Sequence, residues 1–117
     1  MAKPAAILER ESDIQATIRD YLRWTGWYVV RHHQTLGSHV GLADLQAIKG
    51  GQVLMIEVKA RRGRQSQDQL EFEREWTEHG GIYIVARSVE DVQKAIAERA
   101  WKTIRGREPH ATSDNTS

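Results

Sequence analysis

The stretch that decides the fold is residues 53–59, Val-Leu-Met-Ile-Glu-Val-Lys. A nearly continuous apolar run of this length predicts a central strand that is covered on both faces. Strand side chains alternate between faces, so Glu57 and Lys59 are neighbours on one face of this strand. Burying such charged groups costs several kcal/mol each unless they are paired or bind a metal. A simple Glu–Lys ion pair at the end of the strand is the alternative interpretation.

A second carboxylate lies just upstream. Residues 44–49, Asp-Leu-Gln-Ala-Ile-Lys, predict a short strand, and Gly50-Gly51 predicts a tight hairpin turn that makes it antiparallel to residues 53–60. Asp44 precedes Gly50 by six residues and Glu57 follows Gly51 by six, so the two carboxylates come to lie nearly opposite each other. Facing carboxylates repel unless a cation lies between them.

Two acids and a lysine on adjoining strands indicate a particular chemistry. Carboxylate oxygens are the ligands that Mg²⁺ and Mn²⁺ prefer. Lys59, beside them, suits a phosphate or a developing negative charge. A divalent metal, two acids and a lysine are the parts of a phosphodiester hydrolase.

The remaining elements follow from apolar periodicity and capping residues. A helix is expected to begin at Ser12, which has capping-box spacing to Gln15, and to stop at Gly26. A strand is expected over residues 27–33 and a loop over 34–41. A second helix opens at Ser66, with four residues available for its inner face: Leu70, Phe72, Trp76 and His79.

A further strand and helix are expected toward the end of the chain. Residues 82–86 predict a short buried strand, and Ser88 and Asp91 have the spacing of a helix cap. The following helix has an apolar stripe made by Val89, Val92, Ile96 and Ala100. The order αβββαβα predicts an α/β fold, with a mixed central sheet flanked by helices.

Length and composition fit one domain. The chain has 117 residues and no cysteine, which excludes disulfides and cysteine-based zinc sites. We expect a leader over residues 1–10, a domain over 11–104 and a disordered tail over 105–117. No apolar stretch is long enough to span a membrane, and the N-terminal apolar run is too short for a signal peptide. A cytoplasmic protein is therefore expected.

Charge is unevenly distributed along the chain. Residues 19–64 carry a balance of +5, whereas residues 65–100 carry −4. A basic half is typical of a surface that faces phosphates. An ordinary mixed surface explains the same numbers equally well.

These motifs together resemble those of a known superfamily. Gly41-Leu-Ala-Asp44 followed by Glu57-Val-Lys59 resembles the PD-(D/E)XK nuclease pattern and, more narrowly, the VRR-NUC domains, over residues 11–96. Further matches are Glu11, residues 63–69 and residues 86–91. One departure is Ala43, which stands where a proline usually precedes the aspartate. The resemblance implies a restriction-endonuclease-like αβββαβ core with a mixed sheet.

The resemblance also implies roles for individual residues. Asp44, Glu57 and the backbone carbonyl of Val58 would hold Mg²⁺ or Mn²⁺, and Lys59 would orient water or stabilise charge. Glu11 would assist directly or through water, although a charge that favours the helix dipole is an alternative role. Gln69 would contact the active site, or would simply complete a capping box with Ser66.

Other residues are expected to contact DNA. These are Arg61, Arg62, Arg64, Ser66 and, in the glycine-containing loop, His39. A solvated loop is the alternative for the three arginines. Such contacts would position DNA without reading its sequence.

Stand-alone members of this family resemble Holliday-junction resolvases that act as homodimers. The chain is therefore expected to cut branched or four-way DNA as a homodimer, since two symmetric cuts need two sites. Two alternatives remain: a flap or single-strand nuclease or nickase of the same fold, and a catalytically silent DNA-binding subunit.

Overall fold

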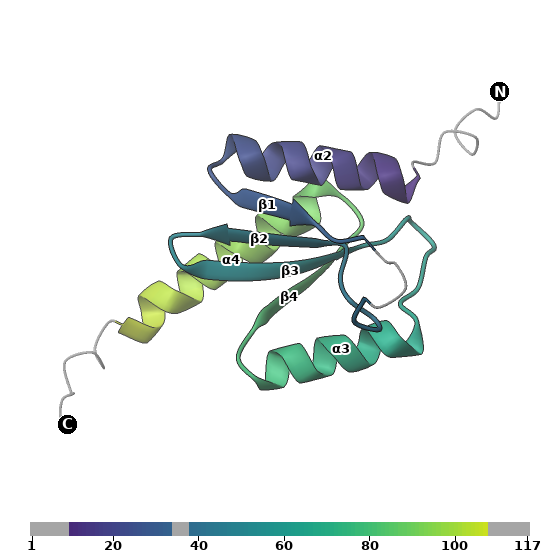
Figure 1. Cartoon of the computed structure of the whole chain (residues 1–117). Coiled ribbons are helices and arrows are strands. Elements are labelled where there is room, and N and C mark those ends of the chain that lie inside the picture. Colours follow the sequence, from purple (N-terminus) through teal and green to yellow (C-terminus); the bar gives the residue numbers. More distant parts are fainter. Residues whose placement is uncertain (1–9, 34–37, 108–117) are drawn as a thin grey trace.

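A mixed four-stranded sheet forms the centre of the molecule (Figure 1). The computed structural model describes residues 10–33 and 38–107. Its elements in chain order are α2 (Glu11–Trp24), β1 (Tyr28–Arg31), β2 (Leu45–Lys49), β3 (Gln52–Val58), α3 (Gln67–Glu78), β4 (Ile82–Ala86) and α4 (Val89–Arg107). The strands lie in the order β1-β2-β3-β4, with β3 and β4 parallel and the other pairs antiparallel. The predicted α/β class and element order are confirmed.

The turn between β2 and β3 sets the register of the sheet. Gly50 and Gly51 both have positive φ, 56° and 84°, as a two-residue hairpin turn of the primed type requires. The register pairs Lys49 with Gln52 and continues outward to Leu45 opposite Ile56. The predicted hairpin is therefore present.

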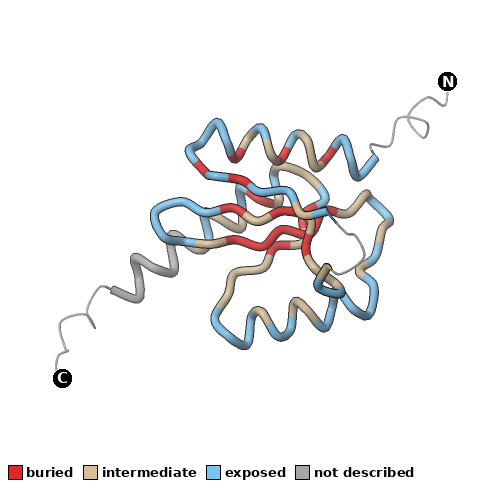
Figure 2. The backbone as a smooth tube through the Cα atoms, in the orientation of Figure 1, coloured by how far each residue is buried: buried red, intermediate tan, exposed pale blue. Residues whose placement is uncertain are grey.

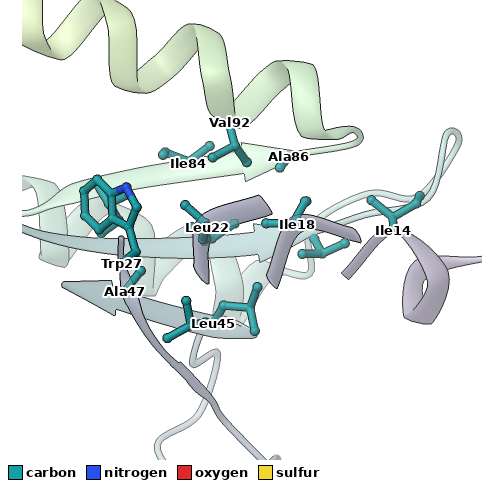
Figure 3. Packing of buried hydrophobic residues seen from close by; sticks show 13 residues of the cluster. Ile14, Ile18, Leu22, Trp27, Leu45, Ala47, Ile84, Ala86 and Val92 are labelled. Carbon is teal, nitrogen blue, oxygen red and sulfur yellow. The ribbon is translucent and has the colours of Figure 1, made fainter. Parts of the chain in front are cut away.

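The apolar core lies on one face of the sheet, beneath α2 and α4. Helix α2 contributes Ile14, Ile18 and Leu22, and α4 contributes Val92. Figure 3 shows these side chains meeting residues of the strands, among them Leu45, Ala47, Ile84 and Ala86. In Figure 2 the buried backbone is concentrated in the central strands. This side of the sheet supplies the hydrophobic stabilisation of the domain.

Helix α3 covers the other face, and none of its residues is buried (Figure 2). Its half-buried positions are Gln69, Phe72, Glu73 and Trp76, which recur at helical spacing. Leu70 is 45% exposed and His79 is exposed, so the expectation that they belong to the inner face was wrong. Two polar residues occupy that face instead, because this part of the helix lies over Glu57.

Several predicted boundaries are corrected. Helix α2 begins at Glu11, and its N-cap is Arg10, with no side-chain cap, so the capping box expected at Ser12 is not formed. Acidic residues in the first turn favour this end electrostatically instead. β1 is shorter than predicted, and Asp44 lies just before β2. Helix α4 continues past residue 104 to Arg107, since extending a formed helix is easy.

Parts of the expected leader and tail lie outside the described residues, namely 1–9 and 108–117, as does segment 34–37 of the expected loop. Within the described parts of the chain, no helix is both long and apolar enough to cross a bilayer.

A matched pair of isoleucines tests where the stability of the fold resides. Ile56 on β3 is fully buried, whereas Ile48 on β2 is 42% exposed. We expect Ile56→Ala to lower the free energy of unfolding by about 2–5 kcal/mol, because it leaves a cavity. Ile48→Ala should cost about 1 kcal/mol or less. Urea denaturation measures both, and equal losses would contradict the assignment of the core.

Candidate active site

Asp44 and Glu57 face each other across the β2–β3 pair. Leu45 is opposite Ile56 in the register, so the next position outward places Asp44 opposite Glu57. The Val58 amide donates to Oδ2 of Asp44 at 2.8 Å, which fixes that carboxylate against the end of β3. The hairpin predicted from the sequence therefore brings the two acids together.

Glu57 is the one charged or polar residue that is buried among the described residues, with 1% of its surface exposed. Its Oε2 lies 3.3 Å from Nζ of Lys59 and accepts a hydrogen bond of 2.7 Å from Nε2 of Gln69. Its Oε1 is buried without a hydrogen-bond partner among the described residues. A buried polar atom left in this way normally has a partner, such as a water or an ion.

Gln69 performs both of the roles that the sequence left open. Its backbone amide donates to Oγ of Ser66, and its side-chain Oε1 accepts from the Ser66 amide at 2.8 Å, which completes a capping box. The other end of the same side chain donates to Glu57. The start of α3 is thereby tied to the buried carboxylate.

The two carboxylates have raised pKa values because they are removed from water. Burial raises the pKa of Glu57 to about 7; the negative charge of Asp44 adds to the rise, and Lys59 opposes it. Burial also raises the pKa of Asp44, while the hydrogen bond from the Val58 amide acts in the opposite direction. Without a cation, therefore, the pair resists carrying its full negative charge.

The donor set fits a divalent cation. Two carboxylates with raised pKa values, one of them with an unpartnered oxygen, gain from a positive charge between them. Among the described residues, no group of three His, Asp or Glu side chains is arranged to hold a metal. Mg²⁺ is usually bound by one or two carboxylates together with waters and phosphate oxygens, so a pair is sufficient.

Glu11 lies at the edge of this site. Its Oε2 accepts a long contact of 3.5 Å from the Ala60 amide, and its negative charge contributes to the raised pKa values of Asp44 and Glu57. A Cβ at Gly63 would lie 3.3 Å from the same oxygen, so the loop after β3 packs closely on Glu11. Glu11 therefore acts on the acids as a nearby charge.

Arg87 organises the loop after β3. Its Nη1 donates to the carbonyl oxygens of Ala60 and Gly63, both at 2.7 Å, and to that of Arg61 at 3.3 Å. Arg87 falls within the motif at residues 86–91, which gives it no role by itself, and its position directly after a buried strand is the one signal in the sequence that points to it. A groove of about 690 Å³ runs along this loop, and its lining consists of Arg61, Arg62, Gly63, Arg64, Gln65, Leu70 and Arg87.

The loop before Asp44 packs on the start of α3. Gly41 has φ +78°, and a Cβ there would overlap the backbone carbonyl of Asp68, so only glycine fits. The ring of His39 contacts the edge of Phe72, at 5.4 Å between centroids, and not the carboxylates. Ser66, expected to contact DNA, serves as the N-cap of α3.

The outer side of α3 is acidic. Arg74 is surrounded there by three glutamates, Glu71, Glu75 and Glu78, with which it forms surface ion pairs. Exposed pairs of this kind contribute little stability. They leave the helix with an excess of negative charge on the side that faces away from the sheet.

Comparisons with known proteins agree with this geometry. The model of the family described as archaeal Holliday junction resolvase (Hjc) matches residues 8–93. A solved structure described as a VRR_NUC domain is similar, with 21% sequence identity, 74% of this chain and 94% of that chain covered, and a TM-score of 0.65. No curated protein matches the sequence.

The mixed sheet, together with this structural similarity, defines the fold as that of a VRR_NUC domain, with a restriction-endonuclease-like core. The family match covers most of the sequence, and the chain belongs to the Hjc family of nucleases.

The raised pKa of Glu57 makes stability depend on pH. Between its ordinary value of 4.5 and about 7, the folded protein retains a proton that the unfolded chain has released. The stabilising contribution of protonated Glu57 is thus fully present below about pH 4.5 and is lost as the pH rises through about 7. The free energy of unfolding should fall by roughly 3 kcal/mol over this range. Urea denaturation without divalent ions, from about pH 4 to about pH 8, measures it.

The matched controls are Glu57→Gln, which lacks the titrating group, and Glu98→Gln on the surface of α4. Relative to Glu57→Gln, the natural protein should become less stable with rising pH. Glu98→Gln should follow the natural protein. A constant difference between the natural protein and Glu57→Gln across this range would contradict the prediction.

Proposed function

We propose that the chain is a Mg²⁺- or Mn²⁺-dependent endonuclease that cleaves four-way DNA junctions as a homodimer. The observation that carries this proposal is the buried Glu57, which faces Asp44, lies beside Lys59 and has an unpartnered oxygen. An ordinary Glu–Lys ion pair on the surface would not have a buried, unpartnered oxygen, because water would hydrogen-bond to its carboxylate.

Each residue of the site has a separate task. Asp44, Glu57 and the Val58 carbonyl would hold the metal, and Glu11 would assist directly or through a water. When bound, the metal lowers the pKa of a water and polarises the scissile phosphate. Gln69 fixes the direction of the Glu57 carboxylate through its 2.7 Å hydrogen bond.

Lys59 supplies a positive charge at this site that comes from the protein and not from a metal ion. Its ammonium group lies 3.3 Å from Glu57 and its side chain is 12% exposed, so part of it is accessible from outside. There it neutralises negative charge that builds on the phosphate as the bond to the leaving oxygen breaks. Orienting the attacking water is the alternative role for the same ammonium group.

The arginine loop provides the surface on which DNA is positioned. Arg61, Arg62 and Arg64 line the groove directly after β3, and Arg87 holds the loop through its carbonyl oxygens. Contacts from arginines to phosphates depend on the shape of the backbone and not on base sequence. A branched substrate recognised by shape fits this arrangement, and the name of the family points to the four-way junction.

Removing either acid should abolish cleavage without unfolding the protein. We expect Asp44→Asn and Glu57→Gln to lower the rate of Mg²⁺-dependent junction cleavage by at least about a hundredfold, because each removes a charged metal ligand. The assay compares a four-way junction with a flap, a duplex and a single strand, each with Mg²⁺ and with a chelator. Asp20→Asn, an exposed change on α2, is the matched control.

The outcomes separate the possible functions. Preferred cleavage of the flap or single strand, or a single nick in the junction, would replace the proposed substrate while keeping the nuclease. Junction binding without cleavage at any metal concentration would indicate a silent DNA-binding subunit. Undiminished cleavage by Asp44→Asn would remove Asp44 from the mechanism.

A dimer should be detectable both as a mass and as a product. Sedimentation should give twice the 13.4 kDa mass of one chain. In mixtures of the natural protein with excess Asp44→Asn, most active dimers contain one working site, and two cuts need two sites. We therefore expect nicked junctions to accumulate in place of resolved duplexes. Full resolution in proportion to the remaining natural chain would contradict the dimer.

A further inference from the structure

His32 lies beside Asp44 on the side away from Glu57. The β1–β2 register pairs Arg31 with Leu45, so the next position outward places His32 opposite Asp44. The backbone amide of His32 donates to the Asp44 carbonyl at 2.8 Å, which continues the ladder by one residue. His32, just after β1, and Asp44, just before β2, therefore lie in one row with Glu57 of β3.

Both ring nitrogens of His32 are engaged. Nδ1 lies 2.8 Å from the carbonyl oxygen of Ala43, and Nε2 lies 3.1 Å from Oε1 of Gln46. A carbonyl oxygen can only accept, so Nδ1 carries a proton and donates to Ala43. At the second contact the partner of Nε2 is the Gln46 amide oxygen, which also can only accept, so Nε2 either donates to it or accepts from the Gln46 amide nitrogen once that amide is turned over.

The contact with Ala43 acts on the peptide unit that precedes Asp44. Ala43 is fully buried, and its carbonyl carbon is bonded directly to the Asp44 nitrogen. A hydrogen bond to that carbonyl fixes the orientation of the peptide plane between Ala43 and Asp44, and with it the direction in which the Asp44 side chain leaves the backbone. The Asp44 carboxylate in turn must reach the Val58 amide and face Glu57.

We propose that His32 is a positioning residue: the proton on its Nδ1 holds the Ala43 carbonyl and thereby aims the Asp44 carboxylate at the end of β3. The proposal deepens the proposed function, because an aimed Asp44 is what a metal site needs. Substituting a group that supports a metal ligand typically lowers metal affinity or activity by about ten- to a hundredfold.

Three substitutions at one position separate the two ring contacts. In His32→Asn the side-chain nitrogen takes roughly the place of Nδ1, so the donor to Ala43 is kept. In His32→Gln the nitrogen takes roughly the place of Nε2, so only the contact with Gln46 is kept. His32→Ala loses both. His33→Ala, at an exposed neighbouring histidine, is the matched control.

The first measurement is the rate of amide hydrogen exchange at Val58, which NMR detects in the absence of metal and DNA. The Val58 amide donates to the Asp44 carboxylate, so its protection reports how well that carboxylate is aimed. We expect His32→Ala and His32→Gln to exchange at least about tenfold faster at Val58, with Ile56 and Ile84 unchanged. His32→Asn and His33→Ala should match the natural protein.

The second measurement is Mn²⁺ binding by calorimetry, with junction cleavage as a third. Affinity and turnover should follow the same order, with loss of about tenfold or more in the Ala and Gln variants and near-natural values in the Asn variant. A purely structural role would lower the stability of all three variants alike without this ranking.

These measurements test the role of His32 independently of the proposed nuclease function. Unchanged Val58 exchange in His32→Ala, or equal effects of Asn and Gln, would overturn the role of His32. If the natural protein neither binds Mn²⁺ nor cuts DNA, the proposed function fails, and hydrogen exchange still tests the aiming of Asp44. Should His32→Ala not fold, the contrast between Asn and Gln carries the test.

Discussion

The register of the β2–β3 hairpin is the constraint on which the rest of the structure depends. Two consecutive glycines with positive φ close the turn, and from there the pairing runs without interruption to the site. A slip of one residue would turn every side chain of a strand to its other face. Glu57 would then enter the apolar core and Ile56 would face the charged side. Because the core side of β3 is fully buried, the fold itself holds the two acids in place.

The two faces of the sheet divide the work of the protein. Beneath α2 and α4 the contacts are apolar, and they stabilise the domain. Beneath α3 the contacts around Glu57 are polar: a capping glutamine reaches the buried acid, and a glycine allows the preceding loop to approach the helix. The polar network therefore ties the start of α3 to the site, while further along the helix Phe72 packs near Tyr83 and Trp76 donates to the Ile82 carbonyl. Rigidity at the site comes from directed hydrogen bonds, and stability comes from the opposite side.

The parts that could be predicted from sequence are those set by local rules. Strand alternation, the Gly50-Gly51 turn and the Ser66 cap each depend on a few adjacent residues, and they were enough to place Asp44 opposite Glu57. The roles of Arg87 and His32 depend on contacts with chain segments 24 to 27 and 11 to 14 residues away, respectively, which no local pattern encodes. The inner face of α3 was predicted correctly at Phe72 and Trp76, which are half-buried, and wrongly at Leu70 and His79, which are exposed because the helix turns other positions toward the sheet.

The acidic outer side of α3 has a consequence for how a polyanion reaches the protein. The glutamates around Arg74 make the outer side of α3 negative, whereas the arginine loop after β3 is positive. If the protein binds DNA as proposed, the backbone would be repelled from the first surface and drawn to the second, so the field would select an orientation before any contact forms. The two charged surfaces would thus steer DNA toward the protein from one side. The guidance weakens as salt screens it, while the arrangement of the buried acids is unaffected by such screening.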